Sequence, residues 1–291
     1  MMDESHQAAL KSRLDALYAR YGSSFLHTDP VGFPRAYTAP EDREVVAFVT
    51  SALAYGRVPQ IRSSVSRLLA VMGDRPAAYV RGFDPRSGRR ALRGFVHRFN
   101  DARDAGLLFW YLRQMLESHG SIEGFFLSPG RPAGEDIGTA LASFVGRALA
   151  LDCSPYYPSG RLPRRAGVRF FLPSPEDGST CKRLNLFLRW MVRPDDGVDL
   201  GTWTGVDPAR LVIPLDTHVS RIAGYIGLTS RRTVDWTMAL EVTGRLRKLD
   251  PCDPIKYDFA LCRLGILEAC PRRRDPLKCA GCGLREICTL S

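Results

Sequence analysis

Four cysteines near the end of the chain carry the spacing of metal ligands. The pattern is Cys270-x8-Cys279-x2-Cys282-x5-Cys288, so four thiols fall within 19 residues. Soft thiolate ligands at such spacing are typical of iron–sulfur clusters and of structural zinc. We therefore expect a metal-bound loop here, with unligated core thiols as the alternative. The spacing leaves iron–sulfur and zinc both open.

The composition favours a globular protein with a polyanionic partner. The chain has 291 residues, of which 45% are hydrophobic, and its net charge is +10 from 41 Lys+Arg and 31 Asp+Glu. That length can bury a substantial core, and the charge suits nucleic acid or an anionic membrane surface. The first residues are polar, and no apolar run follows that could span a bilayer. We expect a cytoplasmic protein, where disulfides explain eight cysteines poorly.

Helical periodicity dominates the chain, and strand alternation is scarce. The short stretch 167–172 (GVRFFL) is the best candidate for extended structure. These patterns predict an all-α fold. Apolar residues recur at helical spacing up to Tyr21 and near 41–54, 58–72, 106–118, 136–151, 182–193, 216–226, 233–248 and 257–267.

One predicted helix begins at a lysine. The segment 172–182 (LPSPEDGSTCK) reads as a tight turn in which Gly178 is free to take a positive φ. The positive helix end, with Arg183 and Arg189 nearby, disfavours a second charge on Lys182. Partial burial would then supply a neutral amine for nucleophilic attack. The alternative is a solvated surface lysine.

A carboxylate opens the next predicted helix. In the segment 213–218 (IPLDTH), Asp216 is placed to cap the helix. The unpaired backbone amides at the helix start favour the ionised form of the Asp216 carboxylate. Such an anion can stabilise a developing positive charge. The alternative is a plain helix cap, and we interpret His218 as a packing residue.

Basic segments surround these two residues. Between Gly160 and Arg193 there are eight Lys/Arg and two Asp/Glu, and three arginines lie in the cysteine loop. The unpaired amides of a helix start also suit a phosphate. A solvated basic surface is the alternative. The predicted DNA contacts are Gly178, Ser179, Arg183, Arg189, Arg272, Arg273 and Arg274.

In this order, the lysine turn, the aspartate segment and the cysteines resemble the helix-hairpin-helix DNA glycosylase superfamily that includes endonuclease III. Lys182 follows Gly178 by four residues, and 215–218 (LDTH) matches the family's aspartate segment. Three features depart from the endonuclease III pattern. The hairpin reads LPSPEDG, the first cysteine gap is eight rather than six, and 34 positions separate the lysine from the aspartate. The longer separation is similar to the archaeal 8-oxoguanine glycosylase branch and an allied uncharacterised bacterial family.

The resemblance implies two helical lobes. Residues 40–195 would form a six-helix barrel that ends in the hairpin and the lysine helix. Residues 1–39 and 196–291 would form the second lobe, with the aspartate helix and a 4Fe–4S loop on Cys270, Cys279, Cys282 and Cys288. Lys182 and Asp216 would face each other across the cleft between the lobes.

The resemblance also implies a function. We expect a monomeric DNA glycosylase and abasic-site lyase that acts on double-stranded DNA with a damaged base, 8-oxoguanine first, through a Schiff base on Lys182. It would lie in the cytoplasm with the nucleoid and bind no membrane. The main alternative is a non-catalytic nucleic-acid-binding protein with a structural metal. A third is an RNA-modifying enzyme stapled by zinc.

Overall fold

The structure is a computed structural model that describes residues 4–268 and 270–290. Helices hold 57% of the residues and strands 1%, so the expected all-α class is confirmed. None of the described helices is long and apolar enough to cross a membrane. The helices are α1 (Glu4–Arg20), α2 (Gly32–Arg35), α3 (Pro40–Ala52), α4 (Val58–Met72), α5 (Pro76–Arg81), α6 (Pro85–Ala91), α7 (Ala102–His119), α8 (Ile122–Leu127), α9 (Gly138–Leu149), α10 (Lys182–Val192), α11 (Thr217–Tyr225), α12 (Trp236–Arg247), α13 (Asp258–Leu267) and α14 (Pro276–Ala280).

Short elements connect these helices. Two strands, β1 (Val96–His97) and β2 (Asn100–Asp101), pair as an antiparallel hairpin. The 3₁₀ turns are η1 (Ser23–Thr28), η2 (Gly167–Phe170), η3 (Pro175–Asp177), η4 (Pro208–Arg210) and η5 (Arg285–Ile287). The expected extended stretch 167–172 is therefore wrong, because residues 167–170 form a 3₁₀ turn.

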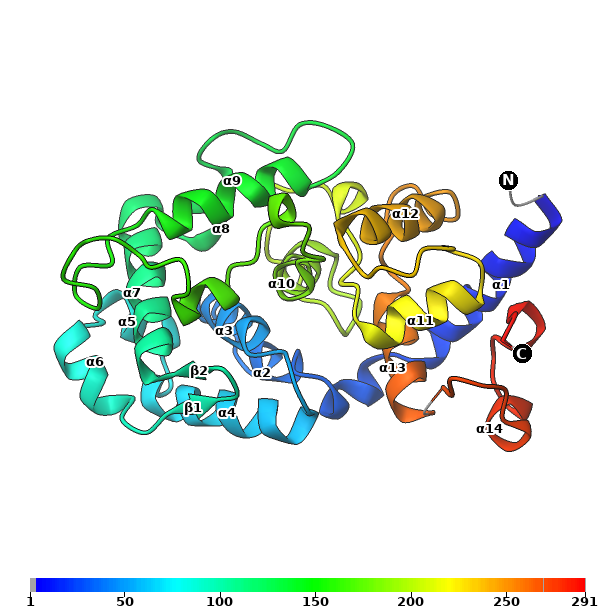
Figure 1. Ribbon diagram of the computed structural model, residues 1–291, viewed down its shortest axis with the longest axis horizontal. Coiled ribbons are helices and arrows are strands. Elements are labelled where there is room, and N and C mark those ends of the chain that lie inside the picture. The colour runs from blue at the N-terminus through cyan, green and yellow to red at the C-terminus, as the bar shows by residue number, and fades with distance from the viewer. Residues whose placement is uncertain (1–3, 269, 291) are drawn as a thin grey trace.

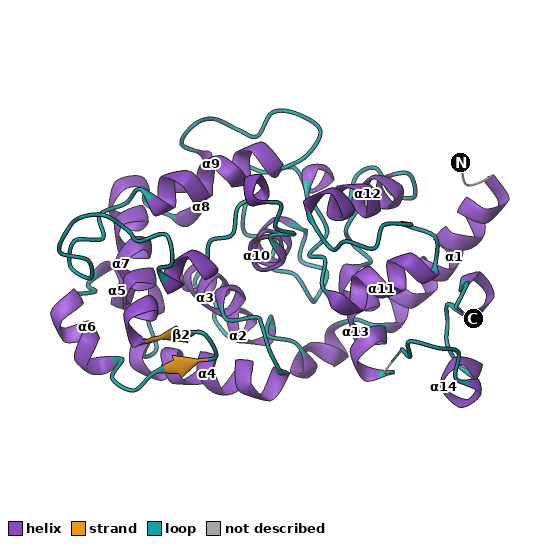
Figure 2. Ribbon diagram, viewed as in Figure 1, coloured by secondary structure: helices purple, strands orange, loops and turns teal. Residues whose placement is uncertain are grey.

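Helix α10 lies near the middle of the molecule (Figure 1). Helices α3–α9 and the hairpin lie on one side of it, and α1 and α11–α14 lie on the other. Loops make nearly all the connections between the helices (Figure 2). Helix α10 packs on α3, and α13 packs against both α1 and α11. The residues at the N-terminal ends of α10 and α11 can therefore lie close together between the two sides of the molecule.

The core is built around α3, which buries residues 44–52 without a break. Such a helix cannot leave one face in water, so other helices must surround it. Phe48 of α3 meets Phe187 of α10 edge to face, with ring centroids 5.0 Å apart. Phe187 in turn meets Trp203 at 5.1 Å. This aromatic packing holds α10, and with it Lys182, in a fixed position.

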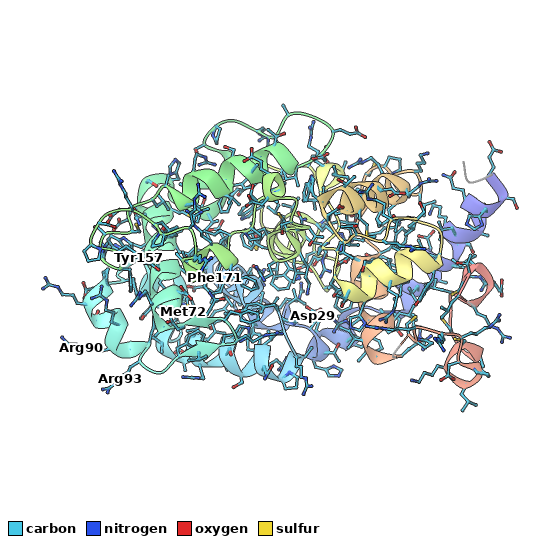
Figure 3. The ribbon with its side chains drawn as sticks, viewed as in Figure 1. Asp29, Met72, Arg90, Arg93, Tyr157 and Phe171 are labelled. Atoms are coloured by element: carbon cyan, nitrogen blue, oxygen red, sulfur yellow. The ribbon has the colours of Figure 1, made fainter. Side chains whose placement is uncertain are left out.

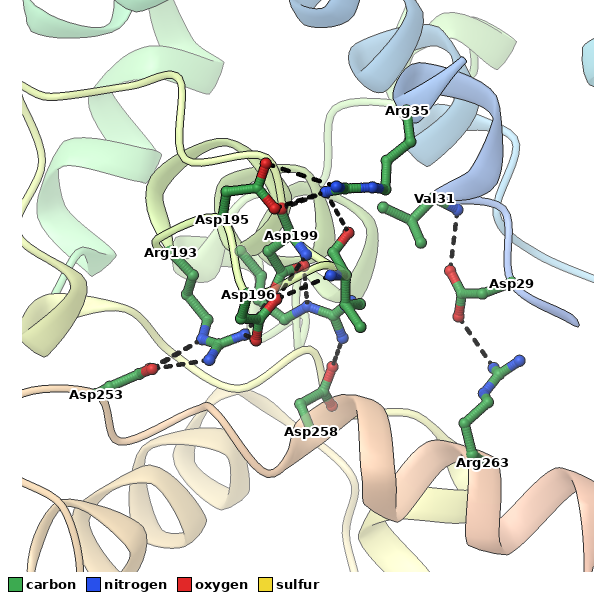
Figure 4. Close-up of polar contacts among 12 residues, drawn as sticks. Asp29, Val31, Arg35, Arg193, Asp195, Asp196, Asp199, Asp253, Asp258 and Arg263 are labelled. Carbon is green, nitrogen blue, oxygen red and sulfur yellow. Dashed lines mark hydrogen bonds and ion pairs between the residues drawn. The ribbon is translucent and has the colours of Figure 1, made fainter. Parts of the chain in front are cut away.

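Two arginines, one on α10 and one directly after it, lie inside the fold and not on its surface. Arg189 and Arg193 are 1% and 3% exposed. Arg189 bonds to Asp199 at 3.1 Å and also to Asp258 of α13. Figure 4 shows this group of ion pairs, in which Arg193 contacts Asp253 at 2.8 Å. Buried charges require such partners, since unpaired ones cost several kcal/mol.

The expected DNA contact at Arg189 is therefore corrected. Its guanidinium is paired with two aspartates and only 1% exposed, so it lies in the wall of the large cavity and not on an outer DNA-facing surface. Periodicity alone marked it as polar, but the acidic partners that bury it come from distant parts of the chain. Arg189 joins α10 to α13.

We predict that Arg189→Ala lowers the free energy of unfolding by about 3–5 kcal/mol, because it leaves the buried Asp258 without its cation and Asp199 paired with Arg193 alone. Chemical denaturation measures this change. Lys11→Ala is the matched control, since it breaks the Lys11–Asp15 pair, whose side chains are 45% and 40% exposed. The control should be destabilised by less than about 1 kcal/mol. Equal destabilisation of the two variants would show that the buried ion pairs do not hold the fold.

Candidate active site

A cavity of about 840 Å³ lies where the two sides of the molecule meet. Its walls come from the loop before α2, the α3–α4 junction, and residues at the starts of α10 and α11 and along α13. Lys182 and Asp216 both line it. Ligand sites are typically concave spaces of this size with a few convergent polar groups.

Lys182 is the first residue of α10, as the sequence predicts. The turn before it is tight: Gly178 has φ 71°, as expected, and Cys181 has φ 48°. A positive φ is uncommon outside glycine, and strained residues of this kind cluster at functional sites. The Cys181 amide donates to the Ser179 hydroxyl at 3.1 Å. The Lys182 Nζ points back to the carbonyl of Ala54 at 3.3 Å.

Asp216 caps α11, again as the sequence predicts. Its Oδ1 accepts hydrogen bonds from the amides of His218 and Val219, both at 2.8 Å. Its Oδ2 lies 3.8 Å from the Lys182 Nζ. The lysine side chain is 32% exposed and the aspartate 13%, so both reach solvent only through the cavity side of the pair. Two residues 34 positions apart are thus brought together.

A thiol on α13 lies next to the Asp216 carboxylate. Cys262 of α13 lies with its Sγ 3.8 Å from the Asp216 Oδ2. Burial raises the pKa of Cys262 to about 12, so the thiol keeps its proton and can donate it in a hydrogen bond. Arg263 contacts that sulfur at 3.3 Å and pairs with Asp29 at 3.0 Å. The sequence indicated only a packing role for Cys262.

An aromatic rim, formed by Tyr55, Phe99 and Phe170, lies at the mouth of the cavity. Tyr55 and Phe170 line the cavity, and Phe99 lies parallel to Tyr55 with centroids 6.4 Å apart. Arg183 lies over Phe170 at 4.0 Å and over Tyr55 at 5.1 Å. Burial lowers the pKa of Arg183 to about 10, so it remains charged at neutral pH. Cations interleaved with aromatic rings are typical of nucleic-acid contacts.

The tip of the β1–β2 hairpin presents Phe99 to solvent. This ring is 69% exposed, which is unusual for phenylalanine. The base of the hairpin is fixed, because the Tyr55 hydroxyl bonds to the His97 carbonyl at 2.9 Å and to Asn100 at 2.5 Å. Arg98 beside it has φ 54°. The sequence does not predict this hairpin, because each of its two strands has two residues and gives too short a pattern to recognise.

The predicted DNA contacts fall in two places. Ser179 and Arg183 line the large cavity, and Gly178 immediately precedes them. Arg272 and Arg273 are exposed in the cysteine loop, and Arg274 lines a second cavity there. These five and Gly178 remain predictions.

The second cavity is lined by all four C-terminal cysteines and measures about 40 Å³. Burial raises the pKa of the Cys270 thiol, and the nearby sulfurs of Cys279, Cys282 and Cys288 add to this effect. In the part of the chain that the structure describes, no three His, Cys, Asp or Glu side chains converge closely enough to hold a single metal ion. All four thiols nevertheless line one cavity.

The donor set of this cavity fits a thiolate-bound group. Arg274, Lys278 and Arg285 line the same space and would offset the charge of four thiolates. Arg221 of α11 bonds to the Cys270 carbonyl at 2.8 Å. Helix α11 thus contacts the cysteine loop along its length and holds Asp216 at its start.

The chain matches one family model over residues 29–267, and that model is described as "Protein of unknown function (DUF2400)". The match covers Lys182 and Asp216 and ends before Cys270. No curated protein and no solved structure matches the chain.

We predict that iodoacetamide at pH 8 modifies Cys252 and leaves Cys181 and Cys262 unmodified. Cys252 is exposed, whereas burial raises the pKa of the other two thiols to about 12. Peptide mapping by mass spectrometry reads the modification, and full labelling in denaturant is the control. Rapid native labelling of Cys262 would contradict its place beneath Asp216.

Proposed function

Because the chain belongs to the DUF2400 family, whose function is unknown, we propose a function from the site itself. We propose that the protein is a DNA glycosylase and abasic-site lyase. Lys182 is the amine nucleophile, and Asp216 is its carboxylate partner. The observation that carries the proposal is the 3.8 Å contact between them at the wall of a cavity of about 840 Å³.

The cavity suits an extruded nucleotide. Its size falls in the usual range for ligand sites, and its mouth combines aromatic rings with a cation. Enzymes that act on a base take it out of the duplex, at a cost of a few kcal/mol that is lowest at damaged positions. The exposed Phe99 stacks in the gap that the extruded base leaves, since it lies on a fixed hairpin beside the mouth.

The chemistry follows from the paired groups. The Lys182 amine, having given a proton to Asp216 or water, attacks the sugar C1′, and the bond from C1′ to the base breaks. The leaving base takes up a proton, and the sugar opens to a Schiff base on Nζ. Loss of a C2′ proton then expels the 3′ phosphate by β-elimination. Asp216 stabilises the cationic sugar because two amides keep its carboxylate fixed.

The same proposal includes the finer points of the family resemblance. The protein has two helical lobes, residues 40–195 and residues 1–39 with 196–291, and acts as a monomer on double-stranded DNA in the cytoplasm. Its substrate is an oxidised base, 8-oxoguanine first. The second candidate function is non-catalytic binding of nucleic acid. This function needs only the basic surfaces and neither Lys182 nor Asp216.

We predict that borohydride traps wild-type protein on lesion-bearing duplex DNA and does not trap Lys182→Gln. Asp216→Asn should keep its affinity for DNA and release base about 10²–10⁴-fold more slowly, since it loses a charged partner of the reaction. Lys248→Gln, an exposed lysine elsewhere, is the matched control. A panel of duplexes with one lesion each identifies the base. If Lys182→Gln traps as well as wild type, the assignment is wrong.

We also propose that Cys270, Cys279, Cys282 and Cys288 hold a 4Fe–4S cluster. Two observations support the proposal: the four cysteines line one cavity with three cationic side chains, and their order along the chain resembles the 4Fe–4S loop of the glycosylase superfamily. The bound cluster would fix the conformation of the loop that carries Arg272, Arg273 and Arg274.

We predict that the purified protein is brown, absorbs broadly near ~400 nm and contains iron and sulfide. Cys282→Ser removes one ligand and should lower the iron content and the absorbance together. Cys252→Ser, outside the cavity, should change neither. A colourless protein with one zinc per chain would contradict the cluster and leave the lysine chemistry untouched.

A further inference from the structure

Helix α6 lies at the end of the molecule that is farthest from α14 and the C-terminus (Figure 1), and six exposed arginines belong to two segments at this end. They come from two segments about 70 positions apart, namely α6 with the residues after it, and the loop 158–166. We call them the arginine patch: Arg86, Arg90, Arg93, Arg161, Arg164 and Arg165.

Helix α6 contacts the residues just before the loop 158–166. Arg89 of α6 bonds to the carbonyl of Pro155 and lies over the Tyr156 ring at 5.0 Å. Arg103 of α7 lies over the Tyr157 ring at 5.9 Å. Figure 3 shows Arg90, Arg93 and Tyr157 at the same end of the molecule. The two segments therefore lie at the same end of the fold.

Most of the charge of the patch is left unbalanced. In the described part of the chain, none of its six members forms an ion pair. Arg86 does interact electrostatically with the exposed Asp84, whose pKa is lowered first by hydrogen bonds at the helix start and also by this arginine. Asp84 also caps α6, Asp101 caps α7, and Asp152 accepts from the Ser154 amide at 2.9 Å. A surface of this kind attracts polyanions.

Both segments run directly into the aromatic rim. Phe99 follows Arg93 by six residues, and Phe170 follows Arg165 by five. Five residues of extended chain span at most about 17 Å, which equals the rise of about five base pairs. The patch thus begins at the mouth of the cavity and extends away from it, on the side opposite to α11 and the cysteine loop.

We propose that the arginine patch binds the phosphates of one arm of the duplex, starting within about five base pairs of the extruded nucleotide. The proposal rests on the proposed function for its ligand. It assigns a second contact surface, which lengthens the DNA footprint on one side only. Each arginine that contacts a phosphate adds to the salt dependence of binding.

The test measures binding to a duplex with a central tetrahydrofuran abasic-site analogue, which the protein cannot cleave by β-elimination. Three duplexes are compared: both arms of fifteen base pairs, the 5′ arm cut to four, and the 3′ arm cut to four. The patch variant is Arg90→Gln/Arg93→Gln/Arg164→Gln. The matched control removes three cations outside the patch: Arg131→Gln/Arg245→Gln/Lys248→Gln.

We expect the affinity of wild type and of the control to fall at least about tenfold when one arm is cut, and little when the other is cut. The affinity of the patch variant for the full duplex should be no higher than the affinity of wild type for the cut duplex that binds more weakly. The slope of its log affinity against log salt should become shallower by about 0.9 for each phosphate that the variant leaves without a cation. On matching lesion-bearing duplexes whose arm toward the patch is cut, its rate of base release should equal that of wild type.

The proposal is overturned if the patch variant and wild type bind all three duplexes with equal affinity. It is also overturned if the variant loses the same factor of affinity on the full duplex and on both cut duplexes. A third contradicting result is a loss of affinity only for single-stranded RNA of the same length. The last result would assign the patch to RNA. Absence of base release by wild type would instead overturn the proposed glycosylase, whatever the binding data show.

Discussion

The bridge that Arg189 makes between Asp199 and Asp258 fixes α10 against α13. Everything at the candidate site follows from that placement. Lys182 begins α10, and Cys262 on α13 supports Asp216 from the other side. Because truncating a buried charge pair strands its partner, the bridge leaves little freedom for α10 to slide. The lysine and the carboxylate therefore meet at 3.8 Å.

The chain uses its arginines in two opposite ways. Those inside, such as Arg189 and Arg263, are matched by carboxylates and serve to join segments. The arginines at the aromatic rim and in the arginine patch form no ion pair with the residues that the structure describes. Their positive charge is therefore available to a ligand at the surface. This division separates stability from binding. Substitutions on the outside should change affinity and salt dependence, whereas substitutions inside should change the free energy of unfolding.

Local signals made part of this structure predictable. The range of α4 matches its prediction, and Lys182 and Asp216 stand at the helix starts that the turn and cap residues indicate. The inward turn of Arg189 was not predictable, because its burial depends on acids that only the tertiary fold brings near. The hairpin that presents Phe99 was missed since four paired residues give too short a pattern for periodicity to register.

The central claim is that one particular amine in this chain reacts at an extruded sugar. Tandem mass spectrometry of the reduced protein–DNA adduct tests it most directly, because the chain has only five lysines, at positions 11, 182, 248, 256 and 278. The account requires the reduced sugar to be attached to the Nζ of Lys182 in the great majority of adducts. Attachment to Lys256, to another lysine or to the N-terminal amine would contradict it.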